Sequence, residues 1–220
     1  EGNKFFENQN GIFIDMSTEK GILTSTIGFG LGITLSDFNN DRLPDLYISN
    51  DFFERDYFYI NTKEGFEETL ESQFNSISMG AMGADAADLN NDLFPDLFVT
   101  EMLPASLKRQ KLKAKYDSWD KYSLMYKKGY FHQYPRNSLQ RNTGNNHFFE
   151  ISRFSGVAAT EWSWASLLFD MNNDGLNDIF VANGIYKDLL DRDYLAYMAN
   201  ETQVQMLLEN KENAIEKLID

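Results

Sequence analysis

Three acidic segments of the chain have the residue types and the spacing of a metal-binding loop. Each reads Asp-x-Asn-Asn-Asp-x-x-x-Asp, so that side-chain oxygens recur at alternate positions and three carboxylates fall within nine residues. Calcium takes six to eight oxygen ligands from carboxylates, amides and backbone carbonyls. Three like charges so close together also repel one another unless a cation lies among them. The pattern therefore predicts three Ca²⁺ sites, one in each segment.

The expected ligands occupy the same positions of the three segments, which we call loops 1, 2 and 3. They are the side chains at positions 1, 3, 5 and 9 and the backbone carbonyl at position 7: Asp37, Asn39, Asp41, Leu43 and Asp45 in loop 1; Asp88, Asn90, Asp92, Phe94 and Asp96 in loop 2; Asp170, Asn172, Asp174, Leu176 and Asp178 in loop 3. Asp and Asn are also common turn residues, so a purely structural role remains an alternative. Three copies favour a metal site, and the number of flexible oxygens favours calcium over magnesium.

The segments around the loops repeat as well. A stretch of small residues precedes each loop, and an aliphatic and aromatic run follows it; short runs built on Asn and Phe recur in turn. Aromatic and β-branched runs separated by Gly, Asn and Asp are typical of strands and turns. Loops 1 and 2 start 51 residues apart, and loops 2 and 3 start 82 apart, or 48 without an insertion of 34 residues. A period near 50 residues with four strands predicts the blades of a β-propeller, an all-β fold.

The repeat predicts that residues 1–220 form part of one β-propeller domain. The expected parts are the end of a blade at 3–15, a blade at 29–70, a blade at 80–151 and half a blade at 162–183. Two insertions with helical spacing follow a second strand, at 102–135 and at 184–220. Because propellers close with about four to eight blades, we expect the remainder of a longer chain to complete this one.

Composition excludes several classes of protein. The net charge of −14 argues against binding to nucleic acid, whose phosphates would repel the chain. An aromatic content of 15% argues against disorder. No apolar run approaches the roughly 18 residues that cross a bilayer, so no transmembrane segment is expected. The chain has no cysteine, which excludes disulfides and thiol chemistry.

Other candidate residues carry weaker signals. Trp162 and Trp164 alternate along an expected strand, so both point to the same side and either pack in the propeller or form a sugar-stacking platform. A glycosidase needs two carboxylates at a fixed separation, and the acids in or beside strands are Asp85, Glu101 and Glu161. The two histidines, His132 and His147, do not have a metal-ligand spacing. Residues 102–136 hold nine bases against two acids, which indicates a solvated helical face or a docking surface for an acidic partner.

The loops and the Gly-rich strand before the first of them resemble FG-GAP/VCBS repeats. The MLP after the second loop's strand, the LQRN run and EWSWASLLFDMNNDGLNDIFVANG resemble the ASPIC-type (cartilage acidic protein-like) propellers more closely. This resemblance implies calcium-binding blades and a role in binding, adhesion or assembly, and bacterial members are exported to the cell surface. Loops of the family usually carry Gly at position 6, which relieves a backbone bend. Gly175 matches and Arg42 and Leu93 depart, so we expect weaker calcium binding at loops 1 and 2.

The sequence thus predicts a calcium-binding β-propeller that is secreted or lies at the cell surface, with the bacterial outer-membrane surface as the expected place. Its expected role is a binding or scaffold module for a protein or glycan partner, and it is not expected to be an enzyme. The alternative is a carbohydrate-active enzyme, or a glycan-capture subunit of a surface complex, whose active residues lie in other blades.

Overall fold

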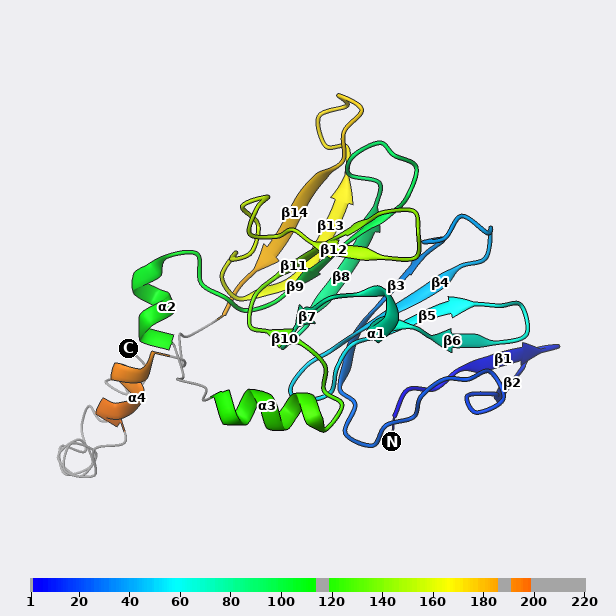
Figure 1. The fold of residues 1–220 in the computed structure, drawn as a ribbon, viewed down its shortest axis with the longest axis horizontal. Helices are drawn as coiled ribbons and strands as arrows, with labels where there is room; N and C mark the ends of the chain where they lie inside the picture. The colour runs from blue at the N-terminus through cyan, green and yellow to red at the C-terminus, as the bar shows by residue number, and fades with distance from the viewer. Residues whose placement is uncertain (1, 114–118, 186–190, 199–220) are drawn as a thin grey trace. The chain divides into compact units, whose positions relative to one another are not determined.

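A computed structural model describes residues 2–113, 119–185 and 191–198 of the chain. The described parts of 1–104 and 117–184 form one compact unit, and those of 105–116 and 185–220 form another. The first unit contains the strands and all three loops (Figure 1). No helix of the described ranges is long and apolar enough to cross a membrane.

Two four-stranded antiparallel sheets form the centre of the first unit. Blade A has the order β3-β4-β5-β6, and blade B has the order β8-β9-β11-β12, so each sheet follows the chain from strand to strand. Their strands are β3 (Gly30–Ser36), β4 (Asp45–Asn50), β5 (Tyr57–Asn61) and β6 (Phe66–Glu68) in blade A, and β8 (Gly83–Ala87), β9 (Asp96–Thr100), β11 (Ser138–Asn142) and β12 (Phe148–Glu150) in blade B. The predicted all-β fold with four-stranded blades is confirmed.

Two further sheets have only two strands each. β1 (Phe6–Gln9) pairs with β2 (Ile12–Asp15), and β13 (Ser163–Phe169) pairs with β14 (Asp178–Asn183). These hairpins lie in the segments predicted as the end of one blade and the first half of another. Because β13 and β14 flank loop 3, their hairpin corresponds to the first two strands of blades A and B. We call it half-blade C.

The loops join the first two strands of each sheet in the same register. The residue before each loop pairs with position 9 of that loop: Ser36 with Asp45, Ala87 with Asp96, and Phe169 with Asp178. Each loop is therefore closed at its base by a strand pair. This shared register places equivalent side chains of the three loops in equivalent surroundings.

Small residues let the first strands of neighbouring sheets approach closely. β3 contacts β8, and β8 contacts β13, so the three strands lie side by side (Figure 1). A Cβ atom on Gly83 would lie 2.8 Å from the carbonyl oxygen of Trp164, and one on Gly32 would lie 3.4 Å from Gly83. A larger side chain at Gly83 would push half-blade C away. This explains the small-residue stretch that precedes the loops.

Aromatic rings fill the space between blades A and B. Phe38, Phe58, Phe74 and Phe148 are buried together, and the rings of Phe74 and Phe148 stack with their centroids 4.4 Å apart. Phe58 meets Phe38 edge to face at 5.1 Å. Because Phe38 is position 2 of loop 1, this core holds one end of the loop in place.

The first insertion is only partly helical. It contains α2 (Leu107–Lys113) and α3 (Trp119–Lys127), and it ends in a short strand, β10 (Gln133–Tyr134), that pairs in parallel with β7 (Ile77–Ser78). The short helix α1 (Leu70–Gln73) precedes β7. The parallel pair was not predicted, since two residues give no periodic pattern. In the second insertion the structure describes α4 (Arg192–Met198), and most of the segment lies outside the described residues.

Candidate functional site

Position 1 of each loop holds the backbone of the loop through both of its carboxylate oxygens. Asp37 accepts hydrogen bonds from the N–H groups of Asp41 at 3.0 Å and Arg42 at 2.7 Å. Asp88 and Asp170 accept the equivalent bonds at 3.1 and 2.8 Å. The carboxylate at position 1 therefore lies inside the turn, where a bound cation would also lie.

Positions 3 and 5 face one another across the same turn. In loop 1 the Nδ2 of Asn39 donates to Oδ2 of Asp41 at 3.0 Å, and Oδ1 of Asp41 accepts the N–H of Leu43 at 2.8 Å. Loops 2 and 3 repeat both bonds within 0.2 Å. The structure thus brings the side chains of positions 1, 3 and 5 together in every loop.

Two residues of each loop adopt the left-handed backbone region. At position 6, φ is 73° for Arg42, 73° for Leu93 and 87° for Gly175. At position 4 an asparagine has φ of 57–60° in all three loops. Asn tolerates this region better than most residues, and Gly adopts it without strain. The bend inferred at position 6 is present, whereas the bend at position 4 was missed although the repeated second Asn is its signal.

Position 9 connects each loop to the sheet. Asp45 is fully buried and accepts the N–H of Phe38 at 3.0 Å and that of Asn61, on the third strand, at 2.9 Å. Asp96 accepts the N–H groups of Leu89 at 3.2 Å and Asn142 at 2.8 Å. Burial, reinforced by the charges of the loop's other carboxylates, raises the pKa of Asp45 and of Asp96 to about 6.

In loop 3, Asp178 makes the equivalent bond to the N–H of Met171 at 3.2 Å. A third strand is not among the described residues of half-blade C, and none of these residues takes the place of Asn61 or Asn142. Asn61 and Asn142 belong to the recurring short runs built on Asn, but their role in holding position 9 was not predicted.

The donor atoms of the loops fit a calcium ion by their chemistry, because all of them are oxygens. Within the described ranges no three His, Cys, Asp or Glu side chains converge on one point. This agrees with the loop geometry: position 3 is an asparagine, and the carboxylate at position 9 faces backbone N–H groups. An ion in loop 1 would be held first by Asp37, Asn39 and Asp41, with the Leu43 carbonyl and one oxygen of Asp45 to complete the shell.

The three loops are also bonded to one another. Asn40, at position 4 of loop 1, donates from Nδ2 to the carbonyl of Leu93, at position 6 of loop 2, at 3.0 Å. Asn91, at position 4 of loop 2, donates in the same way to the carbonyl of Gly175 in loop 3 at 3.1 Å. Asn177 adds a bond from loop 3 back to the carbonyl of Asp88 at 2.8 Å. We call this series of bonds the loop ladder.

The acids considered for catalysis take part in hydrogen bonds that join parts of the fold. Asp85 accepts the N–H of Leu168 at 2.8 Å and so joins blade B to half-blade C. Burial raises the pKa of Glu101 to about 7, although a backbone hydrogen bond from Met102 opposes the rise. The backbone N–H of Glu161 donates to the carbonyl of Leu103 at 3.0 Å.

The remaining aromatic and histidine candidates do not form a metal site. The rings of Trp162 and Trp164 lie 6.3 Å apart, and Nε1 of Trp164 donates to the carbonyl of Gly184 at 2.6 Å. His132 stacks on Tyr126, whereas His147 meets Phe149 edge to face. The two histidines therefore have separate ring partners.

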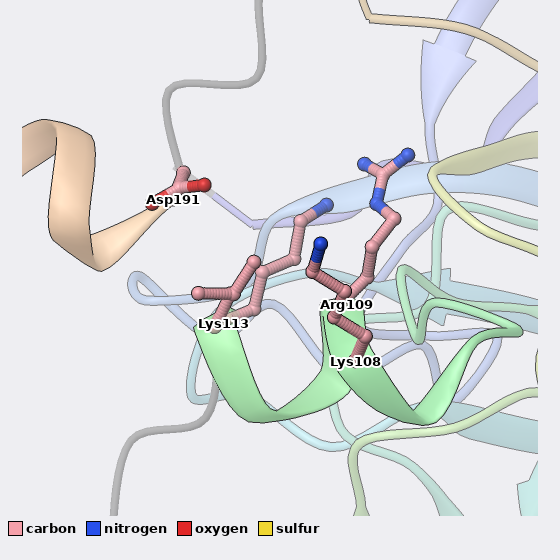
Figure 2. Close-up of a pocket in the computed structure, with 5 residues that line it drawn as sticks. Lys108, Arg109, Lys113 and Asp191 are labelled. Carbon is pink, nitrogen blue, oxygen red and sulfur yellow. The ribbon is translucent and has the colours of Figure 1, made fainter.

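The basic residues of the first insertion contribute to a pocket in the second compact unit. Lys108, Arg109 and Lys113 of α2 line it with Leu112, and Asp191 lies on its other side (Figure 2). The pocket has a volume of about 290 Å³. Three bases beside one acid give it a positive character, as the charge pattern of the insertion indicated.

Comparison with known families agrees with the geometry of the loops. Residues 37–99 match the family model of the FG-GAP-like repeat. No curated protein matches the chain. The matched stretch begins at position 1 of loop 1, contains the whole of loop 2 and ends within β9. From Asp37 to Val99, this chain carries an FG-GAP-like repeat.

Proposed function

We propose that this chain is part of a calcium-stabilised β-propeller that serves as a binding or scaffold module outside the cytosol. The observation that carries the proposal is the threefold repetition of one loop geometry, with the same five side-chain bonds at positions 1, 3 and 5. A turn does not require carboxylates at both position 1 and position 5. The repulsion between these carboxylates lowers the stability of the fold unless a cation lies between them.

The exposed faces at the two ends of the array support the proposal that further blades complete the propeller. Ala84 and Ala86 of β8 pack against the core between blades A and B, whereas the equivalent residues of β3, Ile33 and Leu35, are 71% and 63% exposed. At the other end, Phe98 of β9 is fully buried, and its equivalent in β14, Phe180, is 48% exposed. Apolar side chains in these positions are at least partly buried where a neighbouring sheet is present, so another blade on each side would cover them.

The place of action follows from the affinity expected of such loops. Extracellular calcium modules bind at about 10⁻⁴–10⁻³ M, a concentration that the cytosol does not reach. We therefore place the protein at the cell surface or in the secreted fraction, as its resemblance to ASPIC-type propellers also implies. The acids Asp85 and Glu101 have structural partners, which favours binding of a protein or glycan over catalysis.

A thermal melt with and without chelator tests the proposal. An ion that binds only the folded chain adds about 2.7 kcal/mol at a hundredfold excess over its dissociation constant, and about 0.4 kcal/mol where its concentration equals that constant. We expect the melting temperature to rise by several degrees in millimolar calcium and to fall back in chelator. Asp41→Asn, Asp92→Asn and Asp174→Asn combined should abolish the response, whereas magnesium should not replace calcium. Equal melts in calcium and in chelator would leave the loops as turns.

A further inference from the structure

Two hairpins of the first unit are complementary halves of one blade. β13 and β14 flank loop 3, so they correspond to the first two strands of blades A and B. β1 and β2 correspond to the last two strands, because in each such hairpin an asparagine of the first strand pairs with a phenylalanine of the second. These pairs are Asn8 with Phe13, Asn61 with Phe66, and Asn142 with Phe148. Within the described residues, each half lacks the two strands that the other half has.

The hydrogen bonds of Asn8 support its equivalence to Asn61 and also show what it lacks. The Oδ1 of Asn8 accepts the N–H of Gly11 at 2.8 Å, as the Oδ1 of Asn61 accepts the N–H of Lys63 at 3.1 Å. Asn61 and Asn142 make two further bonds: their backbone N–H groups donate to the aspartate at position 9, and their Nδ2 atoms donate to the carbonyl at position 8. No described residue accepts the corresponding two bonds from Asn8.

The edge of β1 that carries these donors is open. The N–H of Met16 donates to the carbonyl of Phe5 at 2.9 Å, so Phe5 faces β2. Because alternate residues of a strand face opposite edges, Phe6 and Asn8 face away from β2. Among the described strands only β2 pairs with β1. An open edge of this kind is a template for pairing with another strand.

β14 has the matching open edge. The Oδ2 of Asp178 accepts the N–H of Met171, but no described residue donates to its Oδ1. In Asp45 and Asp96 that oxygen accepts the N–H of the asparagine on the third strand. The carbonyl of Asn177, at position 8 of loop 3, has no donor in the described part of the chain either. One strand with an asparagine in the place of Asn8 would supply both donors.

The surfaces beside the two open edges fit the same junction. Phe180 of β14 and Ile33 and Leu35 of β3 are exposed apolar side chains at positions that pack against a neighbouring sheet elsewhere in the chain. The loop ladder ends in the same two places. Asn173, at position 4 of loop 3, has no acceptor among the described residues, and the carbonyl of Arg42, at position 6 of loop 1, has no donor there.

We propose that two copies of the chain complete each other, with β1 of each copy paired to β14 of the other. The register of blades A and B places Phe6 opposite Ile179 and the N–H of Asn8 beside Asp178. Two blades and two halves make three blades in each copy, so two copies form a ring of six, and propellers close with about four to eight blades. This inference rests on the proposed propeller and names the source of its missing blades.

The mass of the 220-residue chain in millimolar calcium, measured by light scattering and by sedimentation, tests the inference. We expect a particle with the mass of two chains at micromolar concentration. Ile33→Asp and Phe180→Asp should each raise the dissociation constant at least about tenfold, since each places a charge in every junction. Phe149→Asp is the matched control, because Phe149 is 50% exposed and Phe180 is 48% exposed, but Phe149 lies on the outer strand of blade B.

A mixture of the two junction variants tests whether unlike faces meet. Ile33→Asp leaves the face of β14 unchanged, and Phe180→Asp leaves the face of β3 unchanged. An equimolar mixture should therefore form dimers that are joined by one intact junction, although each variant alone is monomeric. If like faces met instead, one variant alone would remain a dimer and mixing would not restore the other. That result would overturn the proposal.

A disulfide can report the strand pair directly, because the chain has no cysteine. Lys4 and Val181 take the positions of Tyr57 and Ile48, which lie opposite each other in blade A. A mixture of Lys4→Cys and Val181→Cys chains should form a disulfide between two copies. Lys128→Cys, at an exposed turn after α3, is the control and should not form this disulfide with Val181→Cys.

Two outcomes would overturn the inference. A dimer without the disulfide would show that the copies meet elsewhere. A monomer at micromolar concentration would assign the missing strands to another part of a longer chain. Melts of the same samples in calcium and in chelator separate this test from that of the calcium loops. A monomer that calcium still stabilises would overturn this inference alone, whereas a dimer that calcium does not stabilise would overturn only the calcium proposal.

Discussion

Blades A and B make the same buried hydrogen bond with the acid and the amide exchanged. In blade A the N–H of Asn50 donates to Oδ1 of Asp56 at 2.7 Å. In blade B the N–H of Glu101, which occupies the position of Asn50, donates to Oδ1 of Asn137 at 2.7 Å. Asp56 and Asn137 stand directly before the third strand of their sheets. Each blade thus contains one carboxyl and one amide at this corner, in opposite order.

The exchange shows which chemical group the fold requires at this corner and which residue type can vary. The fold needs an acceptor oxygen facing the backbone N–H after the second strand, and an aspartate or an asparagine supplies it equally well. Each buried carboxyl also accepts a further hydrogen bond, from the Tyr47 hydroxyl for Asp56 and from the Met102 N–H for Glu101. Burial nevertheless raises the pKa of both Asp56 and Glu101 to about 7.

Truncation of the two acceptors should have the largest effect. Asn137→Ala leaves the buried N–H of Glu101 and the part-buried carbonyl of Val157 without their side-chain partner. The hydroxyl of Thr160 loses one bond and keeps the one to Ser163. Each unpaired buried group costs about 1–3 kcal/mol. Asp56→Ala leaves two groups unpaired. We expect losses of about 4 and about 3 kcal/mol in the free energy of unfolding, measured in urea. Asn145→Ala, at an exposed turn, is the control; a smaller loss for Asn137→Ala than for Asp56→Ala would contradict the comparison.

The dependence of the free energy of unfolding on pH should show the effect of the two buried acids, Asp56 and Glu101. Their folded pKa values of about 7 exceed the unfolded values of about 4, so the folded state holds its protons more tightly. Stability should therefore fall as pH rises from about 4 to about 7, by on the order of 2 kcal/mol for each group, and should not fall further above that window.

The experiment is a series of urea titrations between about pH 4 and pH 8 in chelator, so that calcium does not contribute. Asp56→Asn and Glu101→Gln should each remove part of the slope. The double variant should keep only the part due to Asp45 and Asp96, whose pKa values burial raises to about 6. A wild-type stability that rises with pH across the window, or variants that keep its full slope, would show that these carboxyls are ionised in the folded chain.

The comparison extends to the loops, where loop 3 differs from loop 1. Gly175 adopts the bend at position 6 without strain, whereas Arg42 adopts it at a cost. We expect Asp174→Ala to reduce the calcium-dependent stabilisation by about 1–2 kcal/mol and Asp41→Ala by less, because loop 3 binds the ion more tightly. Melts of both variants in calcium and in chelator measure the difference. The reverse order would indicate that the contacts of the position 9 aspartates with their sheets matter more than the bend.

Substitution at position 6 should have the smallest effect. Arg42→Gly removes a side chain from a left-handed residue and should stabilise the chain by about 1 kcal/mol, and Gly175→Ala should cost about as much. Urea titrations in calcium measure both changes. Leu93→Gly is the matched variant in loop 2, and a destabilisation in either glycine variant would mean that the side chain packs more favourably than its backbone is strained.

The sequence allowed the blades and the loops to be predicted because both depend on local repetition. The shared register at Ser36, Ala87 and Phe169 follows from one loop length used three times. The exchanged pair could not be predicted, since Glu101 and Asn137 are 36 residues apart and an insertion separates them. The β7–β10 pair could not be predicted either, because two residues carry no periodic pattern and only tertiary contact decides their conformation.

The loop ladder joins neighbouring blades through equivalent donors and acceptors. The two bonds of the ladder that start at position 4 join an asparagine side chain to the backbone carbonyl of position 6. A carbonyl is present whatever the residue: leucine in loop 2 and glycine in loop 3 accept the bond alike. A blade gained or lost by recombination would find the same donor on one neighbour and the same acceptor on the other. The ladder bonds at a junction therefore do not depend on the residue type at position 6, and the asparagine at position 4 is the side chain that they require.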